Sequence, residues 1–411
     1  MWRCAVLRDP VRLLIIGAGP YGLSMAAQCG HLGIDHLLLG RPMEFWRSSM
    51  PRGMRLRSRT DWHLDPLGIH TLDAYLRTLG LTPEEADPIP LETYLAYAAW
   101  FQQRSGIHAD RRLVRRLEAV GGAGHPFRAT LEDGRVVAAA NVLVTTGFGA
   151  CAHVPDELAR ILPEGSYRHT RDCADLRSLA GRSCLIVGGR QSAFEWAALA
   201  VQNGAAEVHL CYRHDTPGFA RADWTWVDPM LEELARNPRW YRDLTEEARD
   251  EITRHMWRIG RQQLEAWLAP AIAGEAVHLW PRSNVVACRR TPAGRLEVGL
   301  DRGHSLIVDE LVLATGYRMD VGRLQFLAGG DLLPRLATRN GYPVLDEHFQ
   351  STVPGLHFTN RFAAQDFGHF FDFTAGVRAA AAILGRALVA SAESAAALPG
   401  GHRHSRANTA D

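Results

Sequence analysis

Three glycines near the start of the chain have the spacing of a phosphate-binding turn. Gly17, Gly19 and Gly22 form the pattern Gly-x-Gly-x-x-Gly between the apolar run LLII and the helix-like sequence LSMAAQCG. The first glycine permits a tight turn, the second lets the backbone approach a pyrophosphate, and the third lets helix and strand pack closely. The helix N-terminus then faces the phosphates with its partial positive charge. We therefore expect a dinucleotide here, with Pro20 and Tyr21 in its binding site.

A second turn of the same kind begins at Gly188 and Gly189, but Arg190 stands where the second glycine would be. Its side chain would crowd a pyrophosphate, although a guanidinium group also pairs with phosphate oxygens. Gln191 and Ser192 complete the turn. The sequence thus predicts a second, altered nucleotide site.

The residues at the end of the strand that follows each turn are expected to lie near the adenosine end of the nucleotide. Arg213, after the second turn, is placed to meet a 2′-phosphate, which favours NADPH over NADH; a solvated strand end is the alternative. After the first turn, the acid that usually binds a ribose hydroxyl is missing. Gly40 and Arg41 take its place and Glu44 comes later, so we expect this adenosine end to be held differently.

These motifs require strands and helices that alternate along the chain. Two β-α-β units are predicted at 13–39 and 183–213, and each is followed by a hairpin and a strand that ends in Thr-Gly. This order predicts an α/β protein with two related, Rossmann-like, three-layer dinucleotide-binding domains. The second domain, for NAD(P), is inserted in the first, for FAD.

The predicted boundaries divide the chain into four parts. They are 1–175 and 316–390 for the two parts of the FAD-binding domain, 176–315 for the NAD(P)-binding domain, and 391–411 for a tail predicted to be disordered.

A helical insertion rich in tryptophan is predicted at 215–270. Ala248, Ile252, Met256 and Ile259 form an apolar stripe at helical spacing. Two interpretations stay open: the stripe packs in a core, or the insertion is a helical cap over a substrate pocket.

The composition excludes several classes of protein. A formal net charge of +1 argues against nucleic acid or an anionic membrane as a partner. We find neither an apolar run long enough to span a bilayer nor a signal peptide, and therefore expect a cytoplasmic location. The seven cysteines are widely spaced and include no Cys-x-x-Cys pair, so neither a metal site nor a dithiol centre is expected.

The most specific resemblance to a known family lies at Asp309–Tyr317. Its pattern, Asp-x-x-x-Leu-Ala-Thr-Gly-Tyr, is similar to that of the N-hydroxylases of ornithine and lysine, although Gly322 replaces a trailing His or Pro. To about residue 390 the chain resembles the class B flavoprotein monooxygenases. The resemblance places Thr315, Gly316 and Tyr317 at the cofactors.

A second motif of these enzymes is half present. Gly165 and His169 keep its Gly-x-x-x-His core, but Pro163 replaces a phenylalanine and Cys173 replaces the closing aromatic residue. A Baeyer–Villiger assignment is thereby weakened, and His169 is alternatively a surface histidine in a linker.

Residues 42–58 resemble the segment of this family that lies beside the flavin ring. The residues carried over to the flavin are Trp46, Arg47, Met54 and Leu56. Arg55 and Arg57 are candidate catalytic residues that stabilise negative charge or recognise a planar anion such as urate. An exposed basic strand is the alternative.

Residues 354–384 resemble the segment that returns to the flavin. Asn360 stands where an aspartate often binds the ribityl chain. Asp366, His369 and Asp372 are the polar groups expected nearest a substrate, with Asp366 and His369 as catalytic candidates.

The resemblance implies FAD, NADH or NADPH, O2 and a small-molecule substrate, one oxygen atom being transferred to that substrate. Parts of the sequence look closest to a bacterial subgroup that includes an FAD-dependent urate hydroxylase, so urate, in purine catabolism, is the first candidate. N-hydroxylation of an amino acid or amine, an FAD-dependent NAD(P)H reductase and a non-catalytic flavoprotein are the alternatives.

Overall fold

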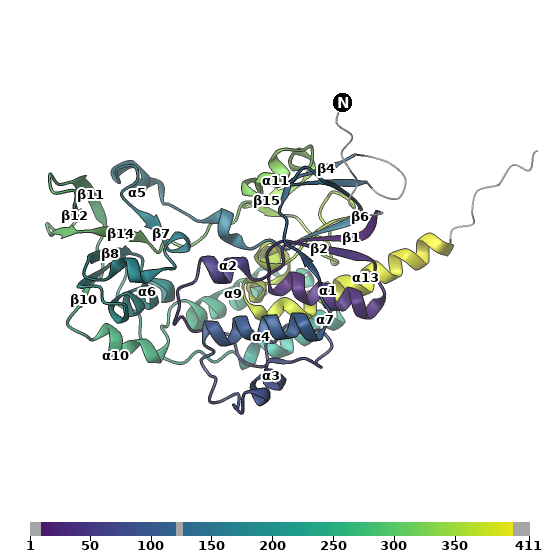
Figure 1. Cartoon of the computed structure of the whole chain (residues 1–411), viewed down its shortest axis with the longest axis horizontal. Coiled ribbons are helices and arrows are strands. Elements are labelled where there is room, and N and C mark those ends of the chain that lie inside the picture. The colour runs from purple at the N-terminus through teal and green to yellow at the C-terminus, as the bar shows by residue number, and fades with distance from the viewer. Residues whose placement is uncertain (1–9, 121–125, 398–411) are drawn as a thin grey trace, which may run out of the picture.

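Two mainly parallel sheets lie in separate lobes of the computed structural model, which describes residues 10–120 and 126–397 (Figure 1). In the first lobe, β1 pairs in parallel with β2 and β6, and the antiparallel strands β5 and β4 extend the sheet. The strands of this sheet are β3 (Ala109–Asp110), β2 (His36–Leu39), β1 (Val11–Ile16), β6 (Val136–Val144), β5 (Phe127–Leu131), β4 (Val114–Ala119) and β17 (Leu356–Phe358).

The second lobe repeats the plan with a five-stranded parallel sheet in the order β10-β9-β8-β14-β7. Its strands are β10 (Val277–Trp280), β9 (Glu207–Cys211), β8 (Ser183–Val187), β14 (Glu310–Leu313) and β7 (Arg168–His169). An antiparallel sheet of β11 (Val285–Arg290), β12 (Leu296–Leu300) and β13 (Ser305–Val308) packs beside it. The predicted α/β class with two Rossmann-like domains is confirmed.

Two predicted boundaries differ from the structure. Strand β7 belongs to the second sheet although it precedes residue 176, because a two-residue strand leaves no periodic signal in the sequence. Helix α13 (Val377–Ala397) continues past residue 391, where the tail was expected to begin. Residues 398–411 lie outside the described part of the chain.

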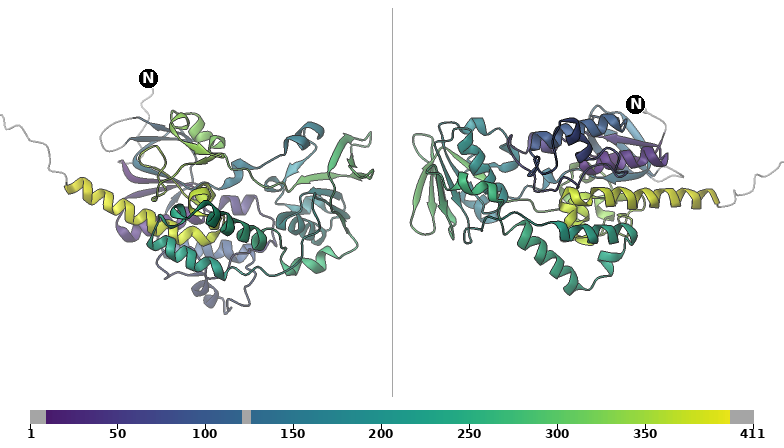
Figure 2. Two further views of the ribbon diagram at one scale, coloured as in Figure 1. Left: turned by 180° about the vertical axis from the view of Figure 1, so that it is seen from behind. Right: turned by 90° about the horizontal axis from the view of Figure 1, so that it is seen from below.

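The helices α1 (Pro20–Leu32) and α13 lie side by side against the first sheet (Figures 1 and 2). The stretch Thr374–Glu393 is long and apolar enough to cross a membrane by length and composition, but 56% of it is buried within the protein. Packing against α1 and the first sheet accounts for the apolar character of this helix.

The helical insertion leaves the second lobe and packs on the first. Trp224, Leu234 and Met256 are buried in the same core as the strands of the first sheet, so core packing of the predicted stripe is borne out for Met256. The helices that pack on the first lobe are α7 (Asp228–Arg236), α8 (Trp240–Asp243) and α9 (Glu246–Gly260), whereas α10 (Ala269–Ile272) packs in the core of the second lobe. Since the chain starts and ends this excursion in the second lobe, the insertion bridges the two lobes.

The other helices pack around the two sheets and on one another. They are α2 (Glu44–Ser48), α3 (Leu72–Thr78), α4 (Leu91–Arg104), α5 (Asp156–Ile161), α6 (Gln191–Gln202), α11 (Gln325–Ala328) and α12 (Ala364–Phe367).

Candidate functional site

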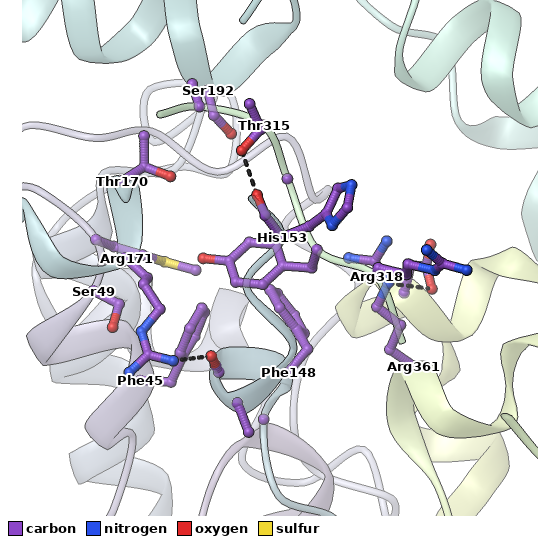
Figure 3. A pocket seen from close by; sticks show the side chains of 18 of the residues that line it. Phe45, Ser49, Phe148, His153, Thr170, Arg171, Ser192, Thr315, Arg318 and Arg361 are labelled. Carbon is purple, nitrogen blue, oxygen red and sulfur yellow. Dashed lines mark hydrogen bonds and ion pairs between the residues drawn. The ribbon is translucent and has the colours of Figure 1, made fainter. Parts of the chain in front are cut away.

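A cleft of about 1970 Å³ runs between the lobes and is lined by both glycine turns. Figure 3 shows part of this cleft, where Ser192 and Thr315 of the second lobe lie across from Phe45 and Phe148. Arginine side chains outnumber acidic ones along its walls. A space of this size and charge suits two large anionic ligands.

Two of the three glycines of the first turn lie close against other backbone atoms, and the third faces open space. Gly17 has φ +116°, and a Cβ atom added to it would lie 2.6 Å from the carbonyl oxygen of Thr145. A Cβ on Gly22 would lie 1.9 Å from the carbonyl oxygen of Gly17, so a side chain there would separate α1 from β1. In front of Gly19 there is no atom within 4 Å of an added Cβ.

The groups around this open side suit a diphosphate. Gly19 caps α1 without a side-chain hydrogen bond, and the first turn of α1 contains no acidic residue, so the free N–H groups of the helix face the cleft. The hydroxyls of Thr145 and Thr146, two more residues of the cleft, are buried without a hydrogen-bond partner. Such unpaired buried groups are rare and indicate a missing ligand or water.

Tyr21 fastens the first turn to the C-terminal segment. Its hydroxyl donates to the carbonyl oxygens of Phe371 and Phe373, at 3.0 and 2.9 Å, and burial raises its pKa well above the usual value. With its single proton committed to the backbone, Tyr21 positions the turn.

At the end of β2, Gly40 lies against the first turn, since a Cβ added to it would be 3.2 Å from the backbone nitrogen of Ala18. The carboxylate of Glu44 reaches the cleft from α2 and lies 3.7 Å from Arg41. An acidic group is therefore present at this end, although it comes from the following helix and not from the strand.

The second turn is more crowded than the first. Gly188 has φ +150°, and an added Cβ would lie 2.5 Å from the carbonyl oxygen of Ala314. A Cβ on Gly189 would lie 2.6 Å from Nε2 of His214. Arg190 caps α6 in the place of Gly19, and its side chain lines the cleft together with Gln191 and Ser192.

Arg213 follows β9 and remains available to a ligand. Its side chain is 77% exposed, and its nearest acidic partner, Glu157, is 3.9 Å away. Both residues line the cleft. This geometry suits recognition of an anionic group at the rim.

The two Thr-Gly segments meet where the chain crosses between the lobes. The rings of Phe148 and Tyr317 pack edge to face with centroids 4.7 Å apart. His153 donates from its backbone nitrogen to the carbonyl oxygen of Gly316 at 3.0 Å, and the hydroxyl of Thr315 donates to the carbonyl oxygen of His153. Burial raises the pKa of Tyr317 to about 12.

His169 is bonded to the second of these Thr-Gly segments and is buried beneath it. It is 4% exposed, so the alternative of a surface histidine is wrong. Its Nδ1 accepts a hydrogen bond from the backbone nitrogen of Arg171 at 3.2 Å, and its Nε2 therefore donates to the carbonyl oxygen of Gly316 at 3.0 Å. Burial lowers its pKa. Both nitrogens are committed to the backbone, and His169 does not line the cleft.

Three of the four residues predicted beside the flavin line the cleft, namely Trp46, Met54 and Leu56. The ring of Trp46 packs on Tyr94 with centroids 5.1 Å apart. Arg47 lies outside this cleft and donates to the carbonyl oxygen of Pro42 at 3.4 Å.

The two arginines predicted to recognise substrate line the cleft, but Arg57 is committed to protein contacts whereas Arg55 is exposed. Arg57 is 10% exposed and donates from Nε to Glu265 at 2.7 Å; its other nitrogens bind carbonyl groups of α9. Arg55 donates to the carbonyl oxygen of Pro88 at 3.1 Å. These contacts do not favour Arg57 as a substrate ligand, because little of its guanidinium group is free.

The other two catalytic candidates lie outside the cleft. The carboxylate of Asp366 accepts from Arg339 at 2.6 Å and from the backbone nitrogen of Leu345 at 2.9 Å. His369 lies 3.3 Å from Asp372. Asp366 therefore holds a turn of the C-terminal segment, and His369 acts on the cleft only through Asp372.

Asp372 is the buried carboxylate at this end of the cleft. Arg261 of the insertion lies 3.1 Å from it and Arg361 lies 3.5 Å from it. Burial alone would raise the pKa of Asp372, but Arg361, His369 and Arg261 outweigh burial and hold the pKa at about 2. This carboxylate is therefore ionised, and its negative charge is balanced by the two arginines.

Asn360 lines the cleft in the left-handed conformation, with φ +59°. Its amide donates to the carbonyl oxygen of Thr146 at 2.8 Å and accepts from the backbone nitrogen of Phe362 at 3.1 Å. Asn360 thus supports the threonines beside the first turn.

Glu195, in α6, is a cleft residue that the sequence analysis missed. It is 2% exposed, and one oxygen accepts from the backbone nitrogen of Arg55 at 2.9 Å. Burial raises its pKa to about 7. A glutamate one turn into a helix gives no sign of burial, because its cover, the segment around Arg55, lies 140 residues earlier.

Only one cysteine of the described part of the chain lies at the cleft. It is Cys211, and burial raises its pKa to about 12. No group of His, Cys, Asp or Glu suited to a metal ion is found among the described residues.

Comparisons with known proteins agree with this arrangement. The family described as "Pyridine nucleotide-disulphide oxidoreductase" matches residues 14–255. A ferredoxin–NADP reductase of Ralstonia nicotianae is 31% identical over 220 residues, which are 52% of this chain and 53% of that protein. An FAD-dependent urate hydroxylase of Xanthomonas campestris pv. campestris is 31% identical over 131 residues, 31% of this chain and 27% of that protein. The chain thus spans about half or less of these relatives.

Among solved structures, an ornithine N-hydroxylase of Kutzneria sp. 744 has a TM-score of 0.75 at 17% sequence identity. The similarity covers 93% of this chain and all of that one. At this identity the similarity establishes the fold of nearly the whole chain.

Proposed function

This chain belongs to the pyridine nucleotide-disulphide oxidoreductase family, and from that premise we propose that it is an FAD-dependent monooxygenase that uses NAD(P)H and O2. The observation that carries the proposal is the cleft that joins both glycine turns and is bordered by α9 of the insertion. FAD binds at the first turn and NAD(P)H at the second, and a small polar substrate is hydroxylated between them.

The first turn supports FAD because its backbone is accessible where a diphosphate must lie. Gly19 leaves that space open, and the unpaired hydroxyls of Thr145 and Thr146 border it. When bound, FAD supplies the acceptor for hydride and the site of oxygen activation. Trp46, Met54 and Leu56 then provide an apolar wall beside the flavin ring.

The insertion supports a monooxygenase because oxygen transfer at a flavin requires that water be kept away. Trp257 and Gly260 of α9 line the cleft, and Trp224 is buried behind them against Phe373, with ring centroids 5.2 Å apart. These residues cover the end of the cleft that lies next to Arg57 and Asp372.

An anionic substrate suits this end better than an amine. The carboxylate of Asp372 is neutralised by Arg261 and Arg361, so it does not offer a free partner to an ammonium group. Urate is therefore the first molecule to test, supported by the partial similarity to a urate hydroxylase. N-hydroxylation of an amino acid or amine is the alternative, after the activity named for the structural neighbour.

A second candidate function is NAD(P)H reduction of a protein electron acceptor. It is favoured by the ferredoxin–NADP reductase that matches half of the chain. Disulfide reduction is disfavoured because, in the described residues, only one cysteine lines the cleft.

The experiment that tests the proposal measures NADPH oxidation and O2 consumption by the FAD-loaded protein with and without urate, ornithine or lysine. The monooxygenase predicts that one substrate stimulates both rates and is recovered as its hydroxylated product. A rate that no small molecule changes, but that a ferredoxin or another one-electron acceptor increases without O2, would instead establish the reductase. Protein that binds no flavin would refute both.

A further inference from the structure

Two arginines from opposite sides of the cleft bind the last turn of α9. Arg57 donates to the carbonyl oxygens of Ile259 and Gly260, at 3.3 and 2.5 Å. Arg190, from the second turn, donates to the carbonyl oxygen of Arg261 at 3.3 Å. Carbonyl groups at a helix C-terminus lack partners within the helix and carry partial negative charge, so they attract cations.

The side chain of Arg261 makes a third connection. Its guanidinium group lies 5.1 Å from the ring centroid of Trp257, and Nη2 is 3.1 Å from Asp372. The end of α9 is therefore joined to the flavin-side loop, to the second turn and to the C-terminal segment at once.

These connections differ in how easily they can be exchanged. Arg57 is buried and also bound to Glu265 at 2.7 Å. Arg190 has no carboxylate within 4.0 Å in the described part of the chain, and burial lowers its pKa. Its contact is a long hydrogen bond to one neutral carbonyl, whereas a phosphate would offer a charge-assisted and often bidentate bond.

The position of Arg190 makes this exchange possible. It caps α6, where the N–H groups of the helix face the cleft, and it takes the place that Gly19 has in the first turn. A diphosphate at the second turn and the carbonyl oxygen of Arg261 would therefore compete for the same guanidinium group.

We propose that Arg190 is an exchangeable contact that transfers from the carbonyl group of Arg261 to the diphosphate of bound NAD(P). Coenzyme binding thereby releases the last turn of α9 and loosens residues 257–265 beside the substrate end of the cleft. The inference rests on the proposed function, since it requires NAD(P) at the second turn. Bound coenzyme therefore changes the affinity for a substrate that lies against this segment. By linkage, bound substrate changes the affinity for the coenzyme by the same factor.

The test is hydrogen exchange of the FAD-loaded protein with and without saturating NADP+. The informative amides are those of Arg261 and Gln262, bonded to the carbonyl oxygen of Trp257, and that of Leu264, bonded to Gly218. We expect their exchange to become at least threefold faster with NADP+. In Arg190→Gly, exchange should already be fast without NADP+ and change little when it is added.

Two controls keep the result interpretable. Arg213→Ala should weaken NADP+ binding but give the wild-type exchange response once saturated. Arg190→Lys, which keeps the charge but not the planar fork, should respond partially and replaces Arg190→Gly if the latter does not fold.

NADP+ binding is measured in a separate titration, by the change that it causes in the flavin absorbance spectrum. Binding with unchanged exchange at residues 261–264 refutes the inference and leaves the proposed function intact. No binding of either NADP+ or NAD+ refutes both. Equal responses of wild type and Arg190→Gly also refute it, because the response would then come from another contact.

Discussion

The two glycine turns have the same backbone plan but different surroundings. In each, the first glycine has positive φ and donates to the end of the second strand: Gly17 to Leu39 at 2.8 Å, and Gly188 to Cys211 at 2.9 Å. The difference lies at the second position, where Gly19 leaves open space and Arg190 extends a long side chain. One turn suits direct backbone contact with a diphosphate, and the other suits contact through a side chain.

This difference matches the two kinds of ligand that the proposed reaction needs. A resident cofactor benefits from close, rigid backbone contacts that cost no side-chain entropy. A coenzyme that enters and leaves in every cycle is served by a contact that can be exchanged. In the proposed function, the same fold would thus hold one nucleotide permanently and the other transiently, through a change at a single position of the turn.

The largest expected effect comes from making the first turn like the second. Gly19→Arg should preserve the fold, since Gly19 has φ −81° and no atom lies within 4 Å of an added Cβ. The side chain would fill the space for the diphosphate, and we expect FAD affinity to fall about 1000-fold, or about 4 kcal/mol. Flavin absorbance after purification and titration with FAD measures this change. Stoichiometric flavin in a folded Gly19→Arg protein would mean that the diphosphate lies elsewhere.

The next prediction compares corresponding positions of the two helices, Ser24 in α1 and Glu195 in α6. The pKa of Glu195 is raised from 4.5 to about 7 in the folded protein, so its stabilising contribution is complete below pH 4.5 and is lost as pH rises through 7. Glu195→Gln should remove a loss of about 2.5 kcal/mol between pH 5 and pH 8. Urea unfolding at both pH values measures it.

Ser24→Ala is the matched control, because a serine does not titrate in this range, and it should change stability equally at pH 5 and pH 8. If Glu195→Gln keeps the wild-type pH dependence, Glu195 is ionised in the folded protein and its burial is compensated.

A smaller effect on stability is expected at the third position of the turns. Gly22→Ala would place a Cβ 1.9 Å from the carbonyl oxygen of Gly17, whereas the second turn already carries Ala193 at this position. Separating helix from strand should cost about 2 kcal/mol, measured by thermal or urea unfolding of the flavin-free protein. Ala193→Gly serves as the control and should cost about 1 kcal/mol, the usual penalty for glycine in a helix. Equal costs at both positions would show that the two helices lie equally close to their strands.

The smallest effect is expected at the residues that follow the second strand of each unit. Arg213 is exposed at the rim of the second lobe, and Arg213→Ala should raise the Kd for NADP+ about tenfold, or about 1.4 kcal/mol, without changing that for NAD+. Arg41→Ala, at the corresponding place in the first lobe, should leave both constants at their wild-type values. An equal loss for both coenzymes would assign Arg213 to the diphosphate and not to the 2′-phosphate.

The sequence by itself determined the fold class, the two glycine turns and the presence of a helical insertion. These are local properties: a positive φ or a missing Cβ restricts residues such as Gly17 and Gly22 within a few positions, and helical periodicity is visible inside one segment. For this reason most of the cofactor residues named from the sequence lie on the cleft.

The partners of the charged side chains were decided by the tertiary structure alone. Arg57 looks like a free cation in the sequence, but it meets Glu265, 208 residues later. Asp366 is held by Arg339, and Glu195 is covered by the segment around Arg55. Burial and pairing depend on which distant segments pack together, because the desolvation that shifts a pKa or consumes a guanidinium group is imposed by neighbours that no local pattern records.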